Sequence, residues 1–521
     1  MIMARNEDGT YSQVGFVKDN AGIDTEYIYD KDGDIVFEKG FTRETSGTVP
    51  LTINGIGKDL KDWSITGNTV QNGTPTPENP VEVQAVGERT RNLFPLDETK
   101  LHVGRIESDG TITYKIGTIS VGTDSITYQS KDIWRGFYTD YIPVTALEVK
   151  LTLLSVTSSL ACSCNCYDTD GNFLGKATGK SSNNTRTFDL IAETAKIRIN
   201  VTSDMKQYTI TNPMLNIGST ALPYEPYGYK IPVVTRGKNL FDKENASPKA
   251  VTNQGVFVSN SSYISSNYIS VSPNTTYTKI PIIKSSQFHD LCEYDENKIF
   301  IRHIFTANNG TFTTSEKTKY IVFNIAKFNI DIAQLEEGTT ATPYEAYHEP
   351  ITTPIYLDSP LYKIGDYADR LSKTEEVRVV KELVLTGKEN WIKSVAYKGS
   401  FYAQIVTGIL SETYTAFCSH LAFSTLSRYA KGKFCFNGDI TKNCNLWLNQ
   451  FDSSTTVADF KAYLAAQYAA GTPVKVYYVV QTPETKTVEP VEIPTLNGTT
   501  VIDVDTAVKP TEMYTKYKSS K

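Results

Sequence analysis

The residues of this 521-residue chain whose types suit ligand contact are aromatic side chains in predicted loops. Trp134, Arg135 and Tyr138 lie just ahead of a predicted strand that begins at Tyr141, and Tyr263 lies in the matching part of a second, similar segment. An indole face can stack on a sugar ring, and a guanidinium can donate to hydroxyl groups. We therefore expect these four side chains to contact carbohydrate. The alternative for Trp134 is burial in a protein core.

Groups suited to catalysis are scattered along the sequence. The five histidines stand apart, and the sequence contains neither an H-E-x-x-H motif nor a G-x-S-x-G motif. The carboxylate pair Glu336 and Glu337 lies in a turn-like segment, and no Gly-rich phosphate loop follows a predicted strand. We expect a protein that is not an enzyme. The alternative is a catalytic site assembled from distant positions in the folded chain.

Two acidic segments resemble calcium loops but lack required positions. In residues 30–41, three aspartates occupy the first ligand positions, whereas Ile and Phe replace the Gly and Glu that such a loop requires. Residues 168–172 fail in the same way, because Phe173 stands at the Gly position. Both segments are therefore predicted to be hairpin turns, and no metal ligand is assigned.

The seven cysteines show no regular disulfide framework. Cys162, Cys164 and Cys166 alternate along a predicted strand, so their side chains project from one face. A metal site would need a fourth ligand and usually a C-x-x-C turn, which this cluster lacks. We expect buried free thiols in a protein that is made in a reducing compartment.

Composition and charge limit the classes of partner. The chain is 40% hydrophobic and 21% charged, and its net charge is −6 without a clustered basic run. Nucleic acid is therefore not an expected partner. No stretch reaches the ~20 apolar residues of a membrane-spanning helix, and the first residues lack the apolar segment of a secretion signal. We expect synthesis in a cytoplasm and no insertion into a membrane.

A duplicated segment organises the chain. The first copy runs from Asn-Leu-Phe at 92–94 to Pro-Tyr-Glu-Pro-Tyr at 223–227, and the second runs from Asn-Leu-Phe at 239–241 to Pro-Tyr-Glu-Ala-Tyr at 343–347. Both contain many strand-length runs separated by turn residues, which is typical of β-sandwiches. The first copy is longer, so we place its insertions in loops between matched strands. The interior matches are 141–144 with 268–271, 167–168 with 294–295, 187–188 with 311–312, and 196–199 with 320–323.

One helix is expected near the C-terminus, over residues 457–470. Thr456 and Asp459 have the spacing that caps a helix start, and Gly471 with Pro473 ends it. The predicted fold class is therefore all-β and multidomain, with tandem sandwiches. The predicted divisions are an N-terminal hairpin segment (1–48), a Pro-rich linker and strand segment (49–90), two sandwiches (91–236 and 237–350), and a C-terminal β domain carrying the helix (351–521).

Several motifs give a specific resemblance. Residues 62–83, followed by Asn-Leu-Phe at 92–94, resemble minor structural proteins of tailed phages and prophages of Gram-positive bacteria, which include tail fibre, baseplate and receptor-binding proteins. Residues 358–366, 389–391 and 477–483 extend the resemblance. The two copies resemble jelly-roll carbohydrate-binding modules carried in tandem. That family often holds a structural calcium ion, but its ligands cannot be mapped onto this sequence.

The resemblance implies a structural component of a phage tail tip that binds host surface polysaccharide multivalently. Residues 1–48 would then attach the protein to the virion, where other tail or baseplate proteins would be its neighbours. The protein would be a homo-oligomer, with a trimer favoured. The protein would be made in the bacterial cytoplasm and located in the virion. The alternatives are a purely structural spacer or decoration protein of the virion, and a polysaccharide depolymerase.

Overall fold

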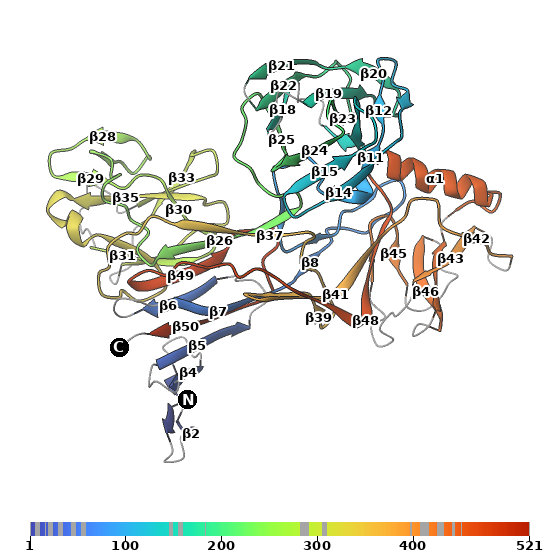
Figure 1. Cartoon of the computed structure of the whole chain (residues 1–521). Helices are drawn as coiled ribbons and strands as arrows, with labels where there is room; N and C mark the ends of the chain where they lie inside the picture. Colours follow the sequence, from blue (N-terminus) through green and yellow to red (C-terminus); the bar gives the residue numbers. More distant parts are fainter. Residues whose placement is uncertain are drawn as a thin grey trace.

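The computed structural model in Figure 1 is 49% strand and 6% helix, and it has one main α-helix near the C-terminus. The predicted all-β fold class is confirmed. The structure describes residues 2–5, 11–15, 17–18, 24–29, 35–42, 48–53, 59–144, 150–154, 160–182, 184–281, 291–304, 310–395, 399–406, 416–424, 432–439, 443–449 and 451–519.

Two sheets packed face to face form the centre of the molecule (Figure 1). The larger has the strand order β2 (Tyr11–Gly15), β1 (Ile2–Arg5), β4 (Asp24–Tyr29), β5 (Ile35–Thr42), β50 (Glu512–Ser519), β7 (Asp59–Thr66), β40 (Arg370–Ser372), β41 (Glu375–Val384), β48 (Lys475–Thr487) and β44 (Phe417–Cys418). The smaller has the order β10 (Glu88–Arg89), β26 (Tyr229–Gly237), β49 (Gly498–Val504) and β6 (Thr48–Ile53), with β37 (Ile351–Leu357) also paired to β26.

The core between these sheets is assembled from distant parts of the sequence. Trp63 on β7 is buried there, and its indole Nε1 donates to the carbonyl of Val491 at 3.0 Å. Ile231 on β26, Ile355 on β37 and Ile502 on β49 contribute to the same core. Residues of the segment 49–90 thus share one hydrophobic core with residues beyond 351.

The two repeated copies are insertions between strands of the smaller central sheet. The first copy, residues 92–227 (the first sandwich), lies between β10 and β26, which pair antiparallel through Arg89 and Tyr229. The second copy, residues 239–347 (the second sandwich), lies between β26 and β37, which pair through Thr235 and Ile351. Each copy therefore leaves the central sheet and returns to it at neighbouring positions. The single strand β26 carries one sandwich at each end.

The first sandwich encloses its own core, which includes Phe137, Ile199 and Leu215. One sheet has the order β11 (Leu101–Val103), β16 (Arg135–Thr139), β23 (Lys196–Ser203), β19 (Leu160–Tyr167) and β20 (Phe173–Lys176), with β17 (Ile142–Pro143) paired to β23. The others are β21 (Thr178–Ser182), β22 (Thr185–Asp189), β18 (Lys150–Leu154) and β25 (Met214–Ile217), and β14 (Thr118–Val121), β15 (Ser125–Gln129) and β24 (Gln207–Thr211).

The second sandwich repeats this arrangement with fewer strands around a separate core. One sheet has the order β29 (Tyr263–Ser265), β35 (Tyr320–Ala326), β32 (Leu291–Tyr294) and β33 (Phe300–Ile304), with β30 (Ile269–Ser270) paired to β35. The other has β34 (Thr311–Thr313), β31 (Thr276–Ile280) and β36 (Gln334–Glu337), and η2 (Lys327–Ile332) precedes β36.

Strand pairing confirms the sequence matches between the copies. The same neighbour relations join β16, β17, β19, β20 and β23 in the first sandwich and β29, β30, β32, β33 and β35 in the second. They also join β22, β18 and β25 in the first and β34, β31 and β36 in the second. The sheet of β14, β15 and β24 has no counterpart among the described residues of the second sandwich. Part of the extra length of the first copy is therefore an added sheet, and the expectation that this length lies in loops is wrong here.

The C-terminal unit packs helix α1 (Val457–Ala469) against a sheet, with Phe460 and Leu464 buried in the contact. The predicted helix and its cap are confirmed, because the Thr456 side chain accepts from the Asp459 amide and the Asp459 carboxylate accepts from the Thr456 amide. The sheet has the order β42 (Ile392–Lys393), β43 (Ser400–Val406), β47 (Asn443–Asn449), β46 (Lys433–Asp439) and β45 (Ala422–Phe423).

A buried asparagine closes the first sandwich. The Asn92 side-chain amide donates to the carbonyls of Pro213 (2.8 Å) and Glu225 (2.9 Å). Its oxygen accepts from the amides of Phe94 (2.9 Å) and Leu215 (3.1 Å). One side chain thereby joins the beginning of the copy to its last strand and to its final motif.

The second sandwich has the same closure. The Asn239 amide donates to the carbonyls of Ala333 (3.3 Å) and Glu345 (2.9 Å). Its oxygen accepts from the amides of Phe241 (3.0 Å) and Leu335 (3.2 Å). The Asn-Leu-Phe motif is thus explained by the pairing of the two ends of each copy.

Replacing either asparagine by alanine should destabilise its own sandwich. Asn92→Ala leaves buried backbone groups without partners, and we expect a loss of about 2–4 kcal/mol in the free energy of unfolding of the first sandwich. Hydrogen exchange followed by mass spectrometry should show lower protection in residues 92–227 and unchanged protection in the second sandwich. Asn239→Ala is the matched control and should give the reverse pattern. Equal loss in both sandwiches from either variant would contradict independent closure.

Glu345 fixes the end of the second sandwich to the central sheet. Its carboxylate accepts from the backbone amide of Thr499 on β49 (2.8 Å) and from the Thr499 hydroxyl (3.0 Å), and it lies 2.9 Å from the Lys238 ammonium. Burial disfavours the charged carboxylate, but the hydrogen bonds from Thr499 and Lys238 outweigh it and lower the pKa of Glu345. The charged form is therefore the one that the fold stabilises.

This lowered pKa predicts a dependence of stability on pH. A carboxyl whose pKa is lower in the folded state stabilises the fold fully above its ordinary pKa of about 4.5, and this stabilisation is lost as the pH falls through the folded pKa. Thermal unfolding of the protein should therefore shift to lower temperature below about pH 4.5. Glu345→Gln should unfold at lower temperature at neutral pH and should lose less on acidification. An identical loss on acidification in Glu345→Gln and the unchanged protein would refute this role.

Candidate functional site

Trp134 lies on the surface at one edge of the first sandwich, immediately before β16. Its side chain is 48% exposed, and its backbone has a φ of 57°, in the left-handed region. The Trp134 amide donates to the carbonyl of Ser203 at 2.6 Å, which holds the residue against the end of β23. The Met205 amide donates to the Ser203 hydroxyl at 3.1 Å, so Met205 lies at the same edge.

Arg135 connects Trp134 to a second exposed aromatic residue. The Arg135 guanidinium carbon lies 3.9 Å from the centre of the Tyr114 ring, a cation–π contact, and Asp132 lies 3.6 Å from the same guanidinium. Tyr114 is 45% exposed and also has a left-handed backbone, with a φ of 51°. We call the exposed apolar side chains of the segments that carry this contact, and of the adjoining end of β23, the Trp134 patch. Its members are Tyr114, Ile116, Ile133, Trp134 and Met205.

The backbone of the patch is strained at its two aromatic residues. A left-handed conformation costs a residue with a Cβ atom roughly 1–2 kcal/mol, and bulky aromatic residues adopt it rarely. Such strain persists where the surroundings impose it, and it concentrates at functional sites. Exposed aromatic rings with one guanidinium and one carboxylate near them can stack on a ring and donate or accept hydrogen bonds at its rim.

The other predicted residues lie elsewhere. Tyr138 on β16 is 8% exposed, and its ring centre is 5.3 Å from that of His102 and 5.3 Å from the Arg198 guanidinium carbon. Burial raises the pKa of Tyr138. Tyr263 begins β29 of the second sandwich and is half-buried, opposite Ala326. Of the predicted set in the first sandwich, Trp134 and Arg135 are therefore the pair that a ligand can reach.

The second sandwich has serines where the first has the patch. Asn200 on β23 and Asn324 on β35 are matched, because each side chain donates to a backbone carbonyl of the neighbouring strands, and Asn200 faces Tyr138 as Asn324 faces Ser265. Trp134 lies four residues before Tyr138, and Ser261 lies four residues before Ser265, so Ser261 occupies the position of Trp134. Tyr114 was not among the predicted contact residues, because it lies 21 residues before Arg135 and no local pattern links the two.

The predicted turn at residues 168–172 is confirmed. The Asp168 carboxylate accepts from the Asn172 amide at 2.8 Å, and the segment joins β19 to β20. Cys164 and Cys166 are buried in β19 and Cys162 is partly exposed, and all three are free thiols. Among the described residues no group of three or more His, Cys, Asp or Glu side chains is placed to hold a metal ion. The aspartates of the predicted turn at residues 30–34 lie outside the described residues.

Comparison of the chain with protein-family models, with curated proteins and with solved structures found no match. Within the described residues, no helix is both long and apolar enough to cross a bilayer. The residues of the chain itself are therefore the basis for any functional proposal.

Trp134→Gly separates the two interpretations of this residue. Glycine adopts a left-handed backbone without strain, although it also gives the unfolded chain more freedom. If the indole contributes little to packing, the free energy of unfolding should be unchanged or raised by up to about 1 kcal/mol. Chemical denaturation of the first sandwich measures this. A loss above about 2 kcal/mol would favour the packing interpretation.

Proposed function

We propose that this chain is a non-enzymatic structural component of a phage tail tip that binds host surface polysaccharide multivalently. The observation that carries the proposal is the pair of matched sandwiches inserted at the two ends of β26, one of which presents the Trp134 patch. The resemblance of residues 62–83 and of the tandem copies to phage tail proteins supplies the setting.

The Trp134 patch suits weak binding to a polysaccharide surface. It is an exposed apolar surface with a cation and an acid at its rim, which resembles the way aromatic side chains accept sugar rings. One such shallow site binds weakly. Repetition of the site across an oligomer, for which a trimer is the favoured form, raises the overall affinity by roughly 10²–10⁴-fold without new contacts.

An array of polysaccharides and teichoic-acid fragments from Gram-positive cell walls tests the proposal with the intact protein. Trp134→Ala should weaken binding to at least one of the retained glycans about tenfold, which corresponds to ~1.4 kcal/mol, without loss of stability. Phe328→Ala is the matched control, because Phe328 is an aromatic residue exposed to 87% on the second sandwich. Binding of no glycan by the intact protein would end the proposal.

The second candidate function is a spacer or decoration protein, which the mounting of both sandwiches on paired strands of the central sheet also fits. Under this alternative, Trp134→Ala leaves adsorption of virions to cells unchanged. A depolymerase is the third candidate. Incubation with capsule or teichoic-acid polymer would then release oligosaccharide, whereas the binding proposal predicts that the polymer stays intact.

A further inference from the structure

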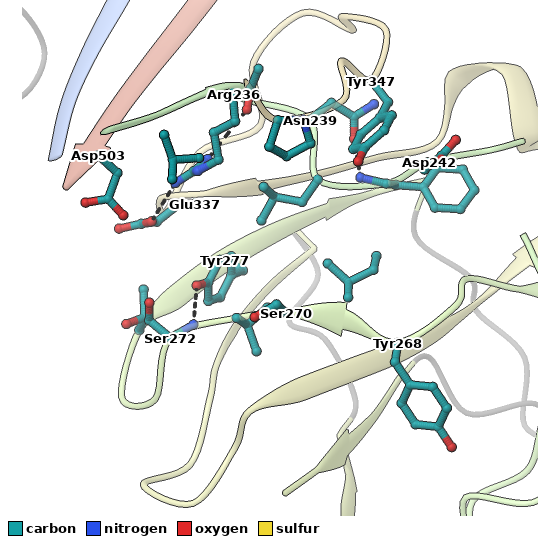
Figure 2. A pocket seen from close by; sticks show the side chains of 18 of the residues that line it. Arg236, Asn239, Asp242, Tyr268, Ser270, Ser272, Tyr277, Glu337, Tyr347 and Asp503 are labelled. Atoms are coloured by element: carbon teal, nitrogen blue, oxygen red, sulfur yellow. Dashed lines mark hydrogen bonds and ion pairs between the residues drawn. The ribbon is translucent and has the colours of Figure 1, made fainter. Parts of the chain in front are cut away.

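An open cleft lies between the second sandwich and the smaller central sheet (Figure 2). Its volume is about 910 Å³, within the range that holds small ligands. The sandwich contributes the segment around β30, which includes Ser270 and Ser272, and the central sheet contributes Arg236 on β26 and Asp503 on β49. Figure 2 shows Tyr347 and Asp242 close together at the side of the cleft that Arg236 and Asn239 also line.

The corresponding surface of the first sandwich is partly occupied by contacts within that sandwich and with the end of α1. Tyr227, which matches Tyr347, receives a hydrogen bond from the Lys100 ammonium at 3.0 Å. At β17, which matches β30, the end of α1 is in contact: Lys196 donates to the carbonyl of Ala469 at 2.6 Å, and a Cβ atom on Gly471 would lie 3.2 Å from Pro143. Figure 1 shows α1 beside the first sandwich near β11.

The second sandwich keeps this surface accessible. Asn245, Ser270 and Lys319 line the cleft and have exposed side chains. In the described part of the chain, no helix lies over β30 as α1 lies over β17. The duplication has therefore produced two matched surfaces, of which one is partly used for packing against the end of α1 and the other is open to a ligand.

The charges that line the cleft are largely paired with one another. Arg236 lies 3.9 Å from Glu337, and Lys509 lies 4.0 Å from Asp503 and 3.8 Å from Asp505. Opposite charges at such distances cancel much of the field that would attract a polyanion or a polycation. A ligand of low net charge fits this lining better than nucleic acid or a teichoic acid.

Neutral polar side chains supply the remaining contacts. Asn245, Asn267, Ser270 and Ser272 are exposed amides and hydroxyls around one cleft. Amides and hydroxyls together offer both donors and acceptors, which sugar hydroxyls require. The half-buried Tyr347 adds an aromatic ring at the same cleft.

We infer that this cleft binds a short neutral oligosaccharide, as a second saccharide site distinct from the Trp134 patch. The inference deepens the proposed function and rests on it. It assigns the second sandwich a site of its own, built from the junction with the central sheet, in place of the patch that only the first sandwich carries.

A blocking substitution tests the inference in the full-length protein. Ser270→Trp places a large side chain in the cleft, and Ser262→Trp places the same side chain at an exposed position of the same sandwich, outside the cleft lining. The probe is an array of neutral oligosaccharides of three to five sugars, built from hexoses and N-acetylhexosamines. Ser270→Trp should weaken binding of at least one retained glycan tenfold or more, while Ser262→Trp and Trp134→Ala leave that glycan bound.

A second variant guards against misfolding of the first. Asn245→Ala combined with Lys319→Ala removes side chains from the cleft without adding bulk, and should weaken the same glycan about three- to tenfold with an unchanged thermal unfolding temperature. If the intact protein binds glycans and both cleft variants bind them equally well, this inference fails and the proposed function stands. If the intact protein binds none, both fail. A change of sedimentation coefficient in Ser270→Trp alone would overturn the inference and mark the cleft as a contact between copies of the chain.

Discussion

The antiparallel pairing of β26 with its neighbours is the constraint on which the rest of the structure depends. β26 pairs with β10 at its start, with β37 along most of its length and with β49 beyond its middle. Both sandwiches are consequently closed loops of chain whose ends are fixed by a hydrogen-bonded ladder. An insertion mounted in this way can vary inside without disturbing the sheet that carries it, because its two ends leave and return at neighbouring positions.

The side-chain hydrogen bonds of Asn92 and Asn239 extend that constraint into each sandwich. The two side chains make the same four hydrogen bonds at equivalent positions, one set beside β10 and the other beside the end of β26. The carboxylates of the two final motifs differ in part of their partners. Glu225 binds Arg91 and Lys230, whereas Glu345 binds Lys238 and reaches Thr499 of the central sheet. The closure within each copy is thus shared, and the docking to the centre differs between the copies.

Much of the architecture could be predicted from local sequence patterns. Alternation identified strands, the repeated motifs located both copies, and the Thr456 and Asp459 spacing located the helix. The central core was not foreseen, because it depends on pairings such as β7 with β50, whose strands lie more than 440 residues apart. A period of two shows that a segment is a strand and does not show its partner. The contact of Arg135 with Tyr114 was missed for the same reason: it joins the first residue of β16 to a loop, and their approach is decided by the folded sheet.

The mounting of both copies on one strand bears directly on multivalent binding. β26 has nine residues, so at about 3.3 Å per residue it holds the two insertion points roughly 30 Å apart. A flexible linker of similar reach would spread the second site over a large volume, and the effective concentration of that site at a polymer would fall as the linker lengthens. A strand that is hydrogen-bonded on both sides holds the two insertion points at one separation, because its conformational entropy is already lost during folding. If the two proposed sites bind, their fixed spacing would favour a polymer that presents its units at a matching repeat, and specificity would then arise from spacing as well as from the contacts at either site.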